Sequence, residues 1–440
     1  MAFVRSIGRW AMTALVLNSI IGSGIFALPG GINRLLGRAS PFAMILAAMV
    51  MAIIMACVTE VASQFSEPGG PYLYTRTAFG RFVGLQIGWF SLLSFVGSIA
   101  VGASLFVDYL VPFLPWTLNL WERGLLMALV ISIPTAVNCW GTRNGATLSA
   151  VMTVAKLLPL ALLILFGLAR FAQHPQTIHA SEIASPGLSN WLRAIALLIF
   201  PFAGWEEALV PSGEVREPRR TIPFALGTGL LACATIYALL QFITVATAGP
   251  NATDQPVAQA ASILLGRGGA ALISIAIMVS TFGYVSANLL NDSRLVYSLA
   301  AHGDFPALFA RTHPRFHTPA VAIIVYAFTG WVLAVSGTFQ FVLALAAWAT
   351  VIYYAGMCGC LIRLRRLHPS ADAFRAPFGP VLSIVAVGVA LTLMTSLTRR
   401  ELLLMCITAL IAAANWLWAR RHHLDLEAKA SAAATPLSQH

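Results

Sequence analysis

A glycine-rich run near the N-terminus contains the first residues whose types and spacing suggest a binding function. Gly22, Ser23 and Gly24 interrupt an otherwise apolar segment, and a proline and two more glycines follow. Glycine and proline weaken helices, whereas a chain in lipid must pair every backbone N–H and C=O internally. Opened backbone is tolerated at bilayer depth only inside protein or beside a water-filled cavity. We therefore expect the backbone from Ile21 to Ile25 to form part of a substrate site.

A second interrupted segment lies at residues 198–211. It contains two prolines, one glycine and the adjacent carboxylates Glu206 and Glu207 within an otherwise apolar run. Neighbouring residues of an intact helix do not share a face, so at most one of these carboxylates points at a given site. The candidate binding residues of this segment are Phe200, Phe202, Ala203, Gly204, Trp205 and Glu206.

Two charges lie deep inside apolar runs. Lys156 is 13 residues after Arg143 and 14 before Arg170, which places it about 20 Å from either flank along a helix. Because such a charge is costly in lipid, we interpret Lys156 as a fixed amine that fills a cation site or carries a coupling proton. A static pair with a carboxylate is the alternative. Glu206 is comparably deep, and three roles are open for it: lining a substrate cavity, accepting a proton, or pairing with Lys156 or a backbone amide.

The composition indicates a membrane protein. Of the 440 residues, 58% are hydrophobic and 10% are charged, against about 25% charged in soluble domains. The net charge of +11 comes from basic residues scattered at the ends of apolar runs, a distribution that does not favour nucleic-acid binding. The six cysteines all lie in apolar runs, where they predict neither a disulfide framework nor a metal site. The sequence has no phosphate-cradling glycine loop, so we do not expect ATP to drive the protein, and we expect no cofactor.

The apolar runs predict an all-α, polytopic fold with about twelve spans of the length that crosses a bilayer. Short loops leave room for one transmembrane domain, residues 1–423, and residues 424–440 read as a disordered cytoplasmic tail. The predicted spans are 10–33, 41–65, 82–112, 124–140, 146–169, 191–213, 222–248, 269–299, 319–336, 339–363, 378–397 and 401–419.

The distribution of lysine and arginine predicts the orientation. About 18 basic residues fall on the side of the two termini and about 8 on the other side. Because cytoplasmic loops carry the excess of basic residues, both termini are expected in the cytoplasm, with the chain in the plasma membrane.

The two interrupted spans occupy matching places in two halves of the chain. The second interrupted span comes five spans after the first. Because five is odd, the second enters the membrane from the opposite side, as in inverted-topology repeats with a site near the midplane. The repeats are expected at about 10–170 and 191–366, with two extra helices at 378–419. The alternative is a pair of unrelated proline and glycine kinks.

The helix ends at the two breaks suit a zwitterion. The half-helix that begins near Ile25 presents free N–H groups, which favour a carboxylate. The half-helix that ends near Gly204 presents unpaired carbonyls, which favour an ammonium group. This pairing predicts recognition of an α-amino acid by main chain, while Phe200, Trp205 and Asn288 either select the side chain or serve as ordinary packing.

Several motifs together resemble those of the amino acid–polyamine–organocation transporters, from the first predicted span to the ninth. The motifs are Gly22-Ser23-Gly24-Ile25-Phe26, Pro68-Gly69-Gly70-Pro71-Tyr72, Phe79-Gly80, Gly88-Trp89, Phe202-Ala203-Gly204-Trp205-Glu206, Glu214, Pro218-Arg219, Ile222-Pro223, Ser293-Arg294, Gly303-Asp304-Phe305-Pro306 and Pro319. The resemblance implies a LeuT-like fold with two inverted five-helix repeats. The chain departs from the family pattern at Glu217-Pro218, where Asn-Pro is usual, and in the doubled Glu206-Glu207.

The resemblance also implies roles for individual residues. Ser23, Gly24 and Ile25 match the carboxylate-binding turn, and residues 200–204 match the stretch that holds the amine, with Phe200 at the position of an aromatic gate. Lys156 matches a lysine that occupies the sodium position in sodium-independent members, which implies proton coupling or exchange. Glu206 matches an acidic position of bacterial antiporters and exporters.

The expected function is therefore secondary active, sodium-independent amino acid transport, coupled to protons or to exchange. A cationic amino acid or polyamine antiporter, or an amino acid exporter, is the alternative. A channel would need a continuous polar lining and an enzyme a nucleophile with its base or a metal cluster, and the sequence favours neither class. The preferred amino acid, the direction of flux and the oligomeric state stay open.

Overall fold

Apolar helices make up almost the whole computed structural model. The structure describes residues 8–65, 69–140, 142–174, 186–208, 215–248, 253, 255–316, 318–367 and 374–434, with backbone alone at 142–156, 218–219 and 422–434. The α-helices are α1 (Arg9–Ile20), α2 (Gly24–Leu36), α3 (Ser40–Ala62), α4 (Gly70–Phe79), α5 (Arg81–Leu110), α6 (Leu120–Trp140), α7 (Thr142–Gln173), α8 (Leu188–Phe202), α9 (Pro218–Ala248), α10 (Pro256–Asn291), α11 (Ser293–Ala301), α12 (Ala320–Ser336), α13 (Phe339–Leu367), α14 (Gly379–Met394) and α15 (Arg399–Ala434).

Helices occupy each of the predicted spans. Eight helical stretches of the described chain are long and apolar enough to cross a membrane, and α12, α14 and the second half of α7 are shorter apolar helices. The all-α membrane fold is therefore confirmed. Two details differ from the prediction: α10 begins at Pro256 rather than near residue 269, and Gly266 interrupts it with a φ of 70°. Its first turns thus form a separate short segment before the predicted span.

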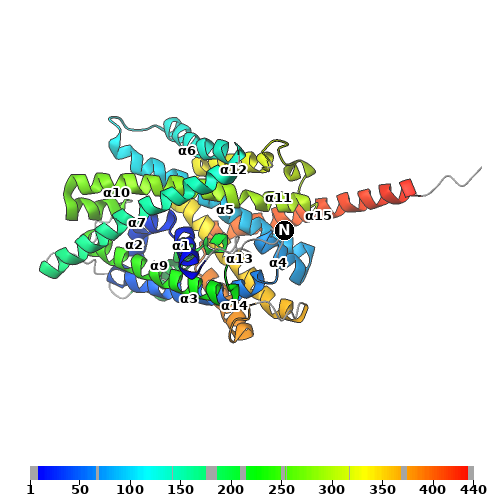
Figure 1. Cartoon of the computed structure of the whole chain (residues 1–440), viewed down its shortest axis with the longest axis horizontal. Coiled ribbons are helices and arrows are strands. Elements are labelled where there is room, and N and C mark those ends of the chain that lie inside the picture. Colours follow the sequence, from blue (N-terminus) through cyan, green and yellow to red (C-terminus); the bar gives the residue numbers. More distant parts are fainter. Residues whose placement is uncertain are drawn as a thin grey trace, which may run out of the picture.

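The long helices lie side by side in one bundle (Figure 1), with α5 and α13 near its centre. The apolar windows of these two helices are 72% and 78% buried, against 28% for α6 and 17% for α15. Small residues allow the central pair to pack closely, because a Cβ atom at Gly97 of α5 would lie 2.7 Å from that of Ala346 on α13. The outer helices instead expose apolar side chains, as expected for contact with lipid.

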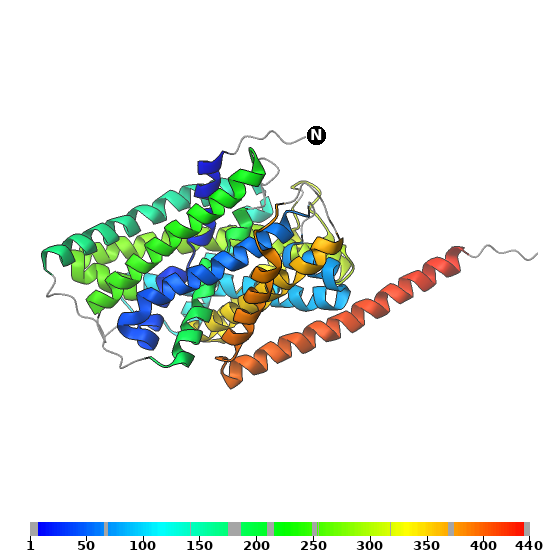
Figure 2. The same ribbon diagram turned by 90° about the horizontal axis from the view of Figure 1, so that it is seen from below.

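The last helix leaves the bundle. α15 continues to Ala434 and projects well beyond the other helices (Figure 2). Residues 424–440 are predicted to be a disordered tail, and residues 424–434 continue α15 as a helix. This stretch is rich in alanine, which is the strongest helix former. Residues 435–440 lie outside the described part of the chain.

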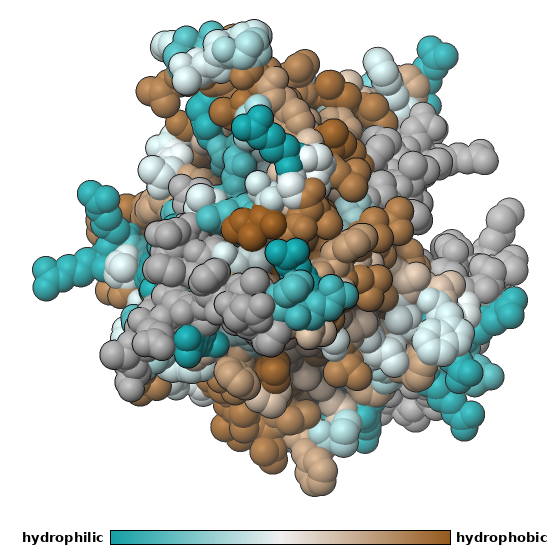
Figure 3. All heavy atoms as spheres, turned by 90° about the vertical axis from the view of Figure 1, so that its left-hand side faces the viewer, coloured by the Kyte–Doolittle hydropathy of each residue, from teal (hydrophilic) through white to brown (hydrophobic). Residues whose placement is uncertain are grey.

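The end of the bundle at the left of Figure 1 carries both polar and apolar side chains. Seen directly from that side, hydrophilic residues lie at the rim and also between patches of hydrophobic residues (Figure 3). Hydrophilic and hydrophobic residues therefore meet at this end, as expected where a helix bundle leaves a bilayer.

Candidate functional site

The first break separates α1 from α2. α1 ends at Ile20 and α2 begins at Gly24, so residues 21–23 form a bend between two half-helices. The Ser23 hydroxyl is fully buried, and it has no hydrogen-bond partner among the described residues. No side chain caps the N-terminus of α2. The predicted opening of this segment is confirmed, and it leaves a hydroxyl beside uncapped backbone N–H groups.

The second break follows α8. α8 ends at Phe202, Ala203 is extended, and Gly204 has a φ of 91°, a value that L side chains rarely adopt. A short 3₁₀ turn at residues 205–208 continues the chain. The predicted interruption near Ala203 and Gly204 is therefore present, and glycine at 204 is required by the backbone conformation.

The two breaks pack against each other in both directions. A Cβ atom at Gly204 would lie 2.7 Å from the carbonyl oxygen of Ser19, which belongs to α1. A Cβ atom at Gly24 would lie 2.8 Å from the Cβ atom of Pro201, which belongs to α8. Each break thus supplies the glycine that lets the other approach. Segments about 180 residues apart in the sequence form one backbone-lined junction.

Tyr237 of α9 connects the same two segments. Its hydroxyl lies 3.1 Å from the carbonyl oxygen of Ile20 and 3.0 Å from that of Pro201, and the side chain is fully buried. A hydroxyl has one proton, so it donates to one of these carbonyls at a time. Phe202 packs on this ring at a centroid distance of 4.9 Å. Phe202 therefore lies in the packing around Tyr237.

Tyr284 of α10 covers the first break. A Cβ atom at Gly22 would lie 2.7 Å from Cε2 of this tyrosine, so the ring lies directly on the Gly22 backbone. Asn288 is one helical turn further along α10, and its amide donates to the Tyr284 carbonyl over 2.8 Å. The donor group of Asn288 is thus used within its own helix, while the neighbouring tyrosine contacts the break.

Glu206 joins the second break to α13. Its Oε1 accepts a hydrogen bond from the Tyr353 hydroxyl over 3.0 Å, and its Oε2 accepts from the Tyr354 hydroxyl over 3.0 Å. The Gly204 N–H also donates to Oε2, over 3.2 Å. Trp205 is fully buried and stacks on Tyr354 with an interplanar angle of 16°. The carboxylate thus fixes the conformation of the break itself.

The two adjacent carboxylates point to different helices. Whereas Glu206 turns to α13, Glu207 accepts a hydrogen bond from the Asn291 amide of α10 over 2.8 Å. This divergence agrees with the expectation that the pair does not share one face. A pair between Glu206 and Lys156 was one of the predicted alternatives. Lys156 belongs to α7, and its side chain lies outside the described part of the chain, so this alternative stays a prediction.

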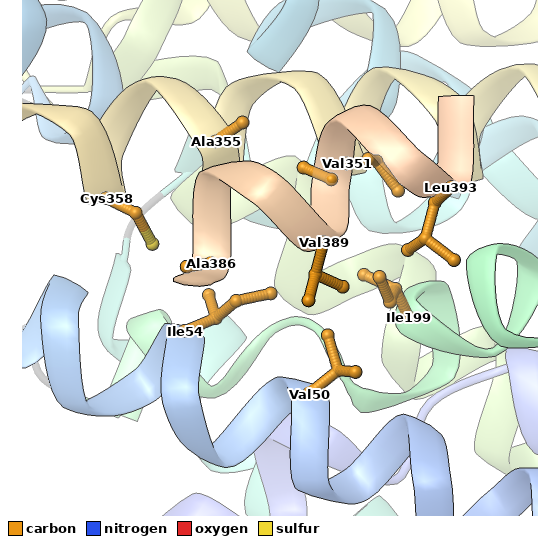
Figure 4. Close-up of a pocket in the computed structure, with 10 residues that line it drawn as sticks. Val50, Ile54, Ile199, Val351, Ala355, Cys358, Ala386, Val389 and Leu393 are labelled. Atoms are coloured by element: carbon orange, nitrogen blue, oxygen red, sulfur yellow. The ribbon is translucent and has the colours of Figure 1, made fainter. Parts of the chain in front are cut away.

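Phe200 lies beside the junction of the two breaks. Its Cδ1 atom would be 3.3 Å from a Cβ atom at Gly24, and the side chain is 5% exposed. The preceding residue, Ile199, lines an apolar pocket between α3, α8, α13 and α14 (Figure 4). The pocket volume is only about 10 Å³, room for one water at most. It is therefore no site for an amino acid.

A buried carboxylate outside the breaks joins two of the sequence motifs. Asp304 accepts hydrogen bonds from Arg81 over 2.5 Å and from the Tyr72 hydroxyl over 2.5 Å, and it pairs with Arg76 over 3.2 Å. Tyr72 belongs to α4, the short helix between the apolar helices α3 and α5. Burial raises the pKa of the Tyr72 hydroxyl above its ordinary value of 10.0, and the Asp304 carboxylate adds to this shift.

Sequence reasoning missed the tyrosines of the site. Tyr237, Tyr284, Tyr353 and Tyr354 all lie within apolar spans, where aromatic residues read as ordinary packing. A buried tyrosine hydroxyl usually needs a partner, and this rule marks such residues as candidates. The identity of each partner depends on contacts between distant helices, which periodicity does not reveal.

The sequence matches the amino acid permease family over residues 7–416. The chain belongs to this family. The broken helices and their mutual packing lie entirely within the matched region, so the site belongs to the part that defines the family. Membership of this family indicates amino acid transport, and the apolar helices indicate a multi-pass membrane protein.

Curated relatives of this permease are transporters. It is 27% identical over 402 residues to the serine/threonine exchanger SteT of Bacillus subtilis (strain 168). The matched region covers 87% of this chain and 89% of the relative. It is 25% identical over 450 residues to the methylthioribose transporter of the same organism, and the matched region covers 96% of this chain and 95% of that relative. Cationic amino acid transporter 4 of Mus musculus is 23% identical over 397 residues, and the matched region covers 86% of this chain and 62% of that relative.

Proposed function

We propose that this protein is a secondary active transporter that moves amino acids across the cytoplasmic membrane by alternating access, without sodium. The driving force is a proton gradient or the exchange of one amino acid for another. We further propose two inverted five-helix repeats, with both termini in the cytoplasm. The excess of basic residues on the side of the termini supports this orientation.

The reciprocal packing of the two breaks carries the proposal. Gly24 meets Pro201 and Gly204 meets Ser19, so the uncapped N-terminus of α2 and the C-terminus of α8 belong to one junction. The first helix end favours an anion and the second a cation. An α-amino acid carries both groups on one carbon atom, so the main chain alone supplies recognition of its common part.

The side chains around the junction are suited to a small or neutral substituent. Glu206 is engaged by two tyrosine hydroxyls and the Gly204 N–H, so its charge is already solvated by protein donors. Phe200 and Trp205 add apolar bulk. A serine/threonine exchanger among the relatives supports the same choice.

A cationic amino acid or polyamine antiporter is the second candidate. The adjacent Glu206 and Glu207 bring two carboxylates to the second break, which would favour an extra positive charge on the substrate. A cationic amino acid transporter among the relatives also supports it. An exporter that uses the same site in the outward direction belongs to this candidate.

Transport by purified protein in proteoliposomes tests the proposal. Radiolabelled serine and arginine are offered separately, in sodium-free buffer and in sodium buffer, with and without a pH gradient or internal amino acid. We expect serine uptake without sodium, stimulated by one of the two driving forces. Preferred uptake of arginine or putrescine would select the second candidate, and strict sodium dependence would overturn the proposal.

Substitution of Lys156 tests the proposed independence of transport from sodium. We propose that its amine takes the place of a bound cation, because a charge deep in an apolar helix needs such a function. The variant Lys156→Ala should lose transport or its proton dependence while it still folds. Wild-type transport by Lys156→Ala would reduce the lysine to a structural role.

A further inference from the structure

An open groove lies at the end of α13, far from the two breaks in the sequence. It is formed by α13 and the last residue of α4, and its volume is about 490 Å³. The lining residues are Phe79, Gly359, Ile362, Arg363, Arg366 and Leu367. The groove therefore has the size of a ligand site, and its lining combines two arginines with apolar side chains.

The two arginines of the groove have no acidic partner among the residues that the structure describes. Arg363 and Arg366 are three residues apart on α13, so their side chains lie on one face of the helix. Neither forms an ion pair with a carboxylate in the described part of the chain, whereas the intervening Arg365 is bound to Glu60. The Arg363 guanidinium lies 5.8 Å from the centre of the Phe79 ring. The groove thus presents two cations beside an apolar wall.

The position of the groove matches the edge of a bilayer. α13 is apolar enough to cross a membrane, and that stretch ends at Leu367. Phe79 and Leu367 are 39% and 49% exposed, so apolar surface is available to an acyl chain beside the cations. Basic pockets between membrane helices are suited to the headgroups of anionic lipids.

We propose that this groove binds one anionic phospholipid. The phosphate of the headgroup pairs with Arg363 and Arg366, and an acyl chain lies along Phe79, Ile362 and Leu367. Arginine suits this role because its guanidinium forms paired hydrogen bonds to phosphate oxygens. The site is independent of the amino acid junction and does not depend on the proposed transport activity.

Titration of the purified, delipidated full chain in detergent tests the site. Bound phosphatidylglycerol and phosphatidylcholine are counted by native mass spectrometry. We expect saturable binding of phosphatidylglycerol in preference to phosphatidylcholine. The double variant Arg363→Gln/Arg366→Gln should bind it about 25-fold more weakly, about fivefold for each arginine. Equal affinity for the two lipids would overturn the proposal.

Two further variants separate the groove from general charge effects. A Cβ atom at Gly359 would lie 4.0 Å from Phe79, so the Cβ atom of a leucine fits at this position. The rest of the side chain in Gly359→Leu would then fill the groove. This variant should also lose the lipid while both arginines remain. The exposed pair Arg399 and Arg400, the first two residues of α15, provides the matched control. Arg399→Gln/Arg400→Gln should leave the affinity unchanged, and an equal loss there would contradict the assignment.

A competition arm distinguishes a lipid from a soluble phosphate. Excess inorganic phosphate should leave phosphatidylglycerol bound, because the apolar wall contributes to its affinity. Full displacement by inorganic phosphate would overturn the lipid assignment. Unfolding midpoints of all variants should match that of the wild type. A double variant that folds normally and retains wild-type affinity would also overturn the proposal.

Discussion

The Gly204 backbone lies so close to the Ser19 carbonyl that a Cβ atom would be 2.7 Å from that oxygen. This contact packs the second break against α1, and the Gly24–Pro201 contact packs the first break against α8. Two helix interruptions therefore form a single junction, in which each depends on a glycine. The proposed amino acid site follows from this geometry.

Gly204→Ala should strongly reduce transport. The new methyl group would approach the Ser19 carbonyl, and alanine would have to adopt a φ of 91°. The strained backbone alone costs about 1–2 kcal/mol, so we expect uptake at most about one tenth of wild type. The control is Gly227→Ala in α9, where nothing lies within 4 Å of an added Cβ. Normal transport by Gly204→Ala would refute the close junction.

Tyr237→Phe should weaken substrate binding without unfolding the protein. The change removes the hydroxyl that lies between the Ile20 and Pro201 carbonyls. A buried carbonyl without its donor costs about 1–3 kcal/mol, so the apparent affinity should fall about 5- to 150-fold. Tyr109→Phe is a matched control, because that buried hydroxyl contacts the Phe26 carbonyl of α2 over 3.4 Å and neither of the two carbonyls that Tyr237 joins. Similar effects of both changes on affinity would argue against a specific role for Tyr237.

Glu206→Gln should change the dependence of transport on pH. Glutamine keeps the shape of the side chain, but its amide nitrogen does not accept the hydrogen bonds that the tyrosines of α13 donate. The variant also removes the one titratable group that caps the Gly204 N–H. Initial uptake rates across a pH series measure the effect. An unchanged pH profile and substrate preference would remove Glu206 from the coupling mechanism.

Alkaline pH should destabilise the protein through Tyr72. Its hydroxyl stays protonated in the folded state, because burial raises its pKa above 10.0. The unfolded chain releases this proton near its ordinary pKa, so the stabilisation is complete below about pH 10 and falls as pH rises toward the folded-state value. Thermal unfolding in detergent should show this loss in the wild type and a smaller loss in Tyr72→Phe. Parallel curves for the two proteins would contradict the assignment.

The sequence predicted the elements of the fold and the positions of both breaks. Glycine and proline within apolar runs marked them, because such residues interrupt helices wherever they occur. The contacts of Gly204 with α1 and of Gly22 with Tyr284 were not predictable, since they depend on how distant helices pack. The same limit applies to Tyr237 and to the tyrosine partners of Glu206.

The recognition of both charged groups of an amino acid is the central claim, and competition measures it most directly. Proteoliposomes take up a radiolabelled amino acid in the presence of serine, of ethanolamine, which lacks the carboxylate, or of glycolate, which lacks the amine. Because we propose that each break binds one of the two groups, serine alone should inhibit uptake strongly. Inhibition by ethanolamine or glycolate as strong as that by serine would contradict the account.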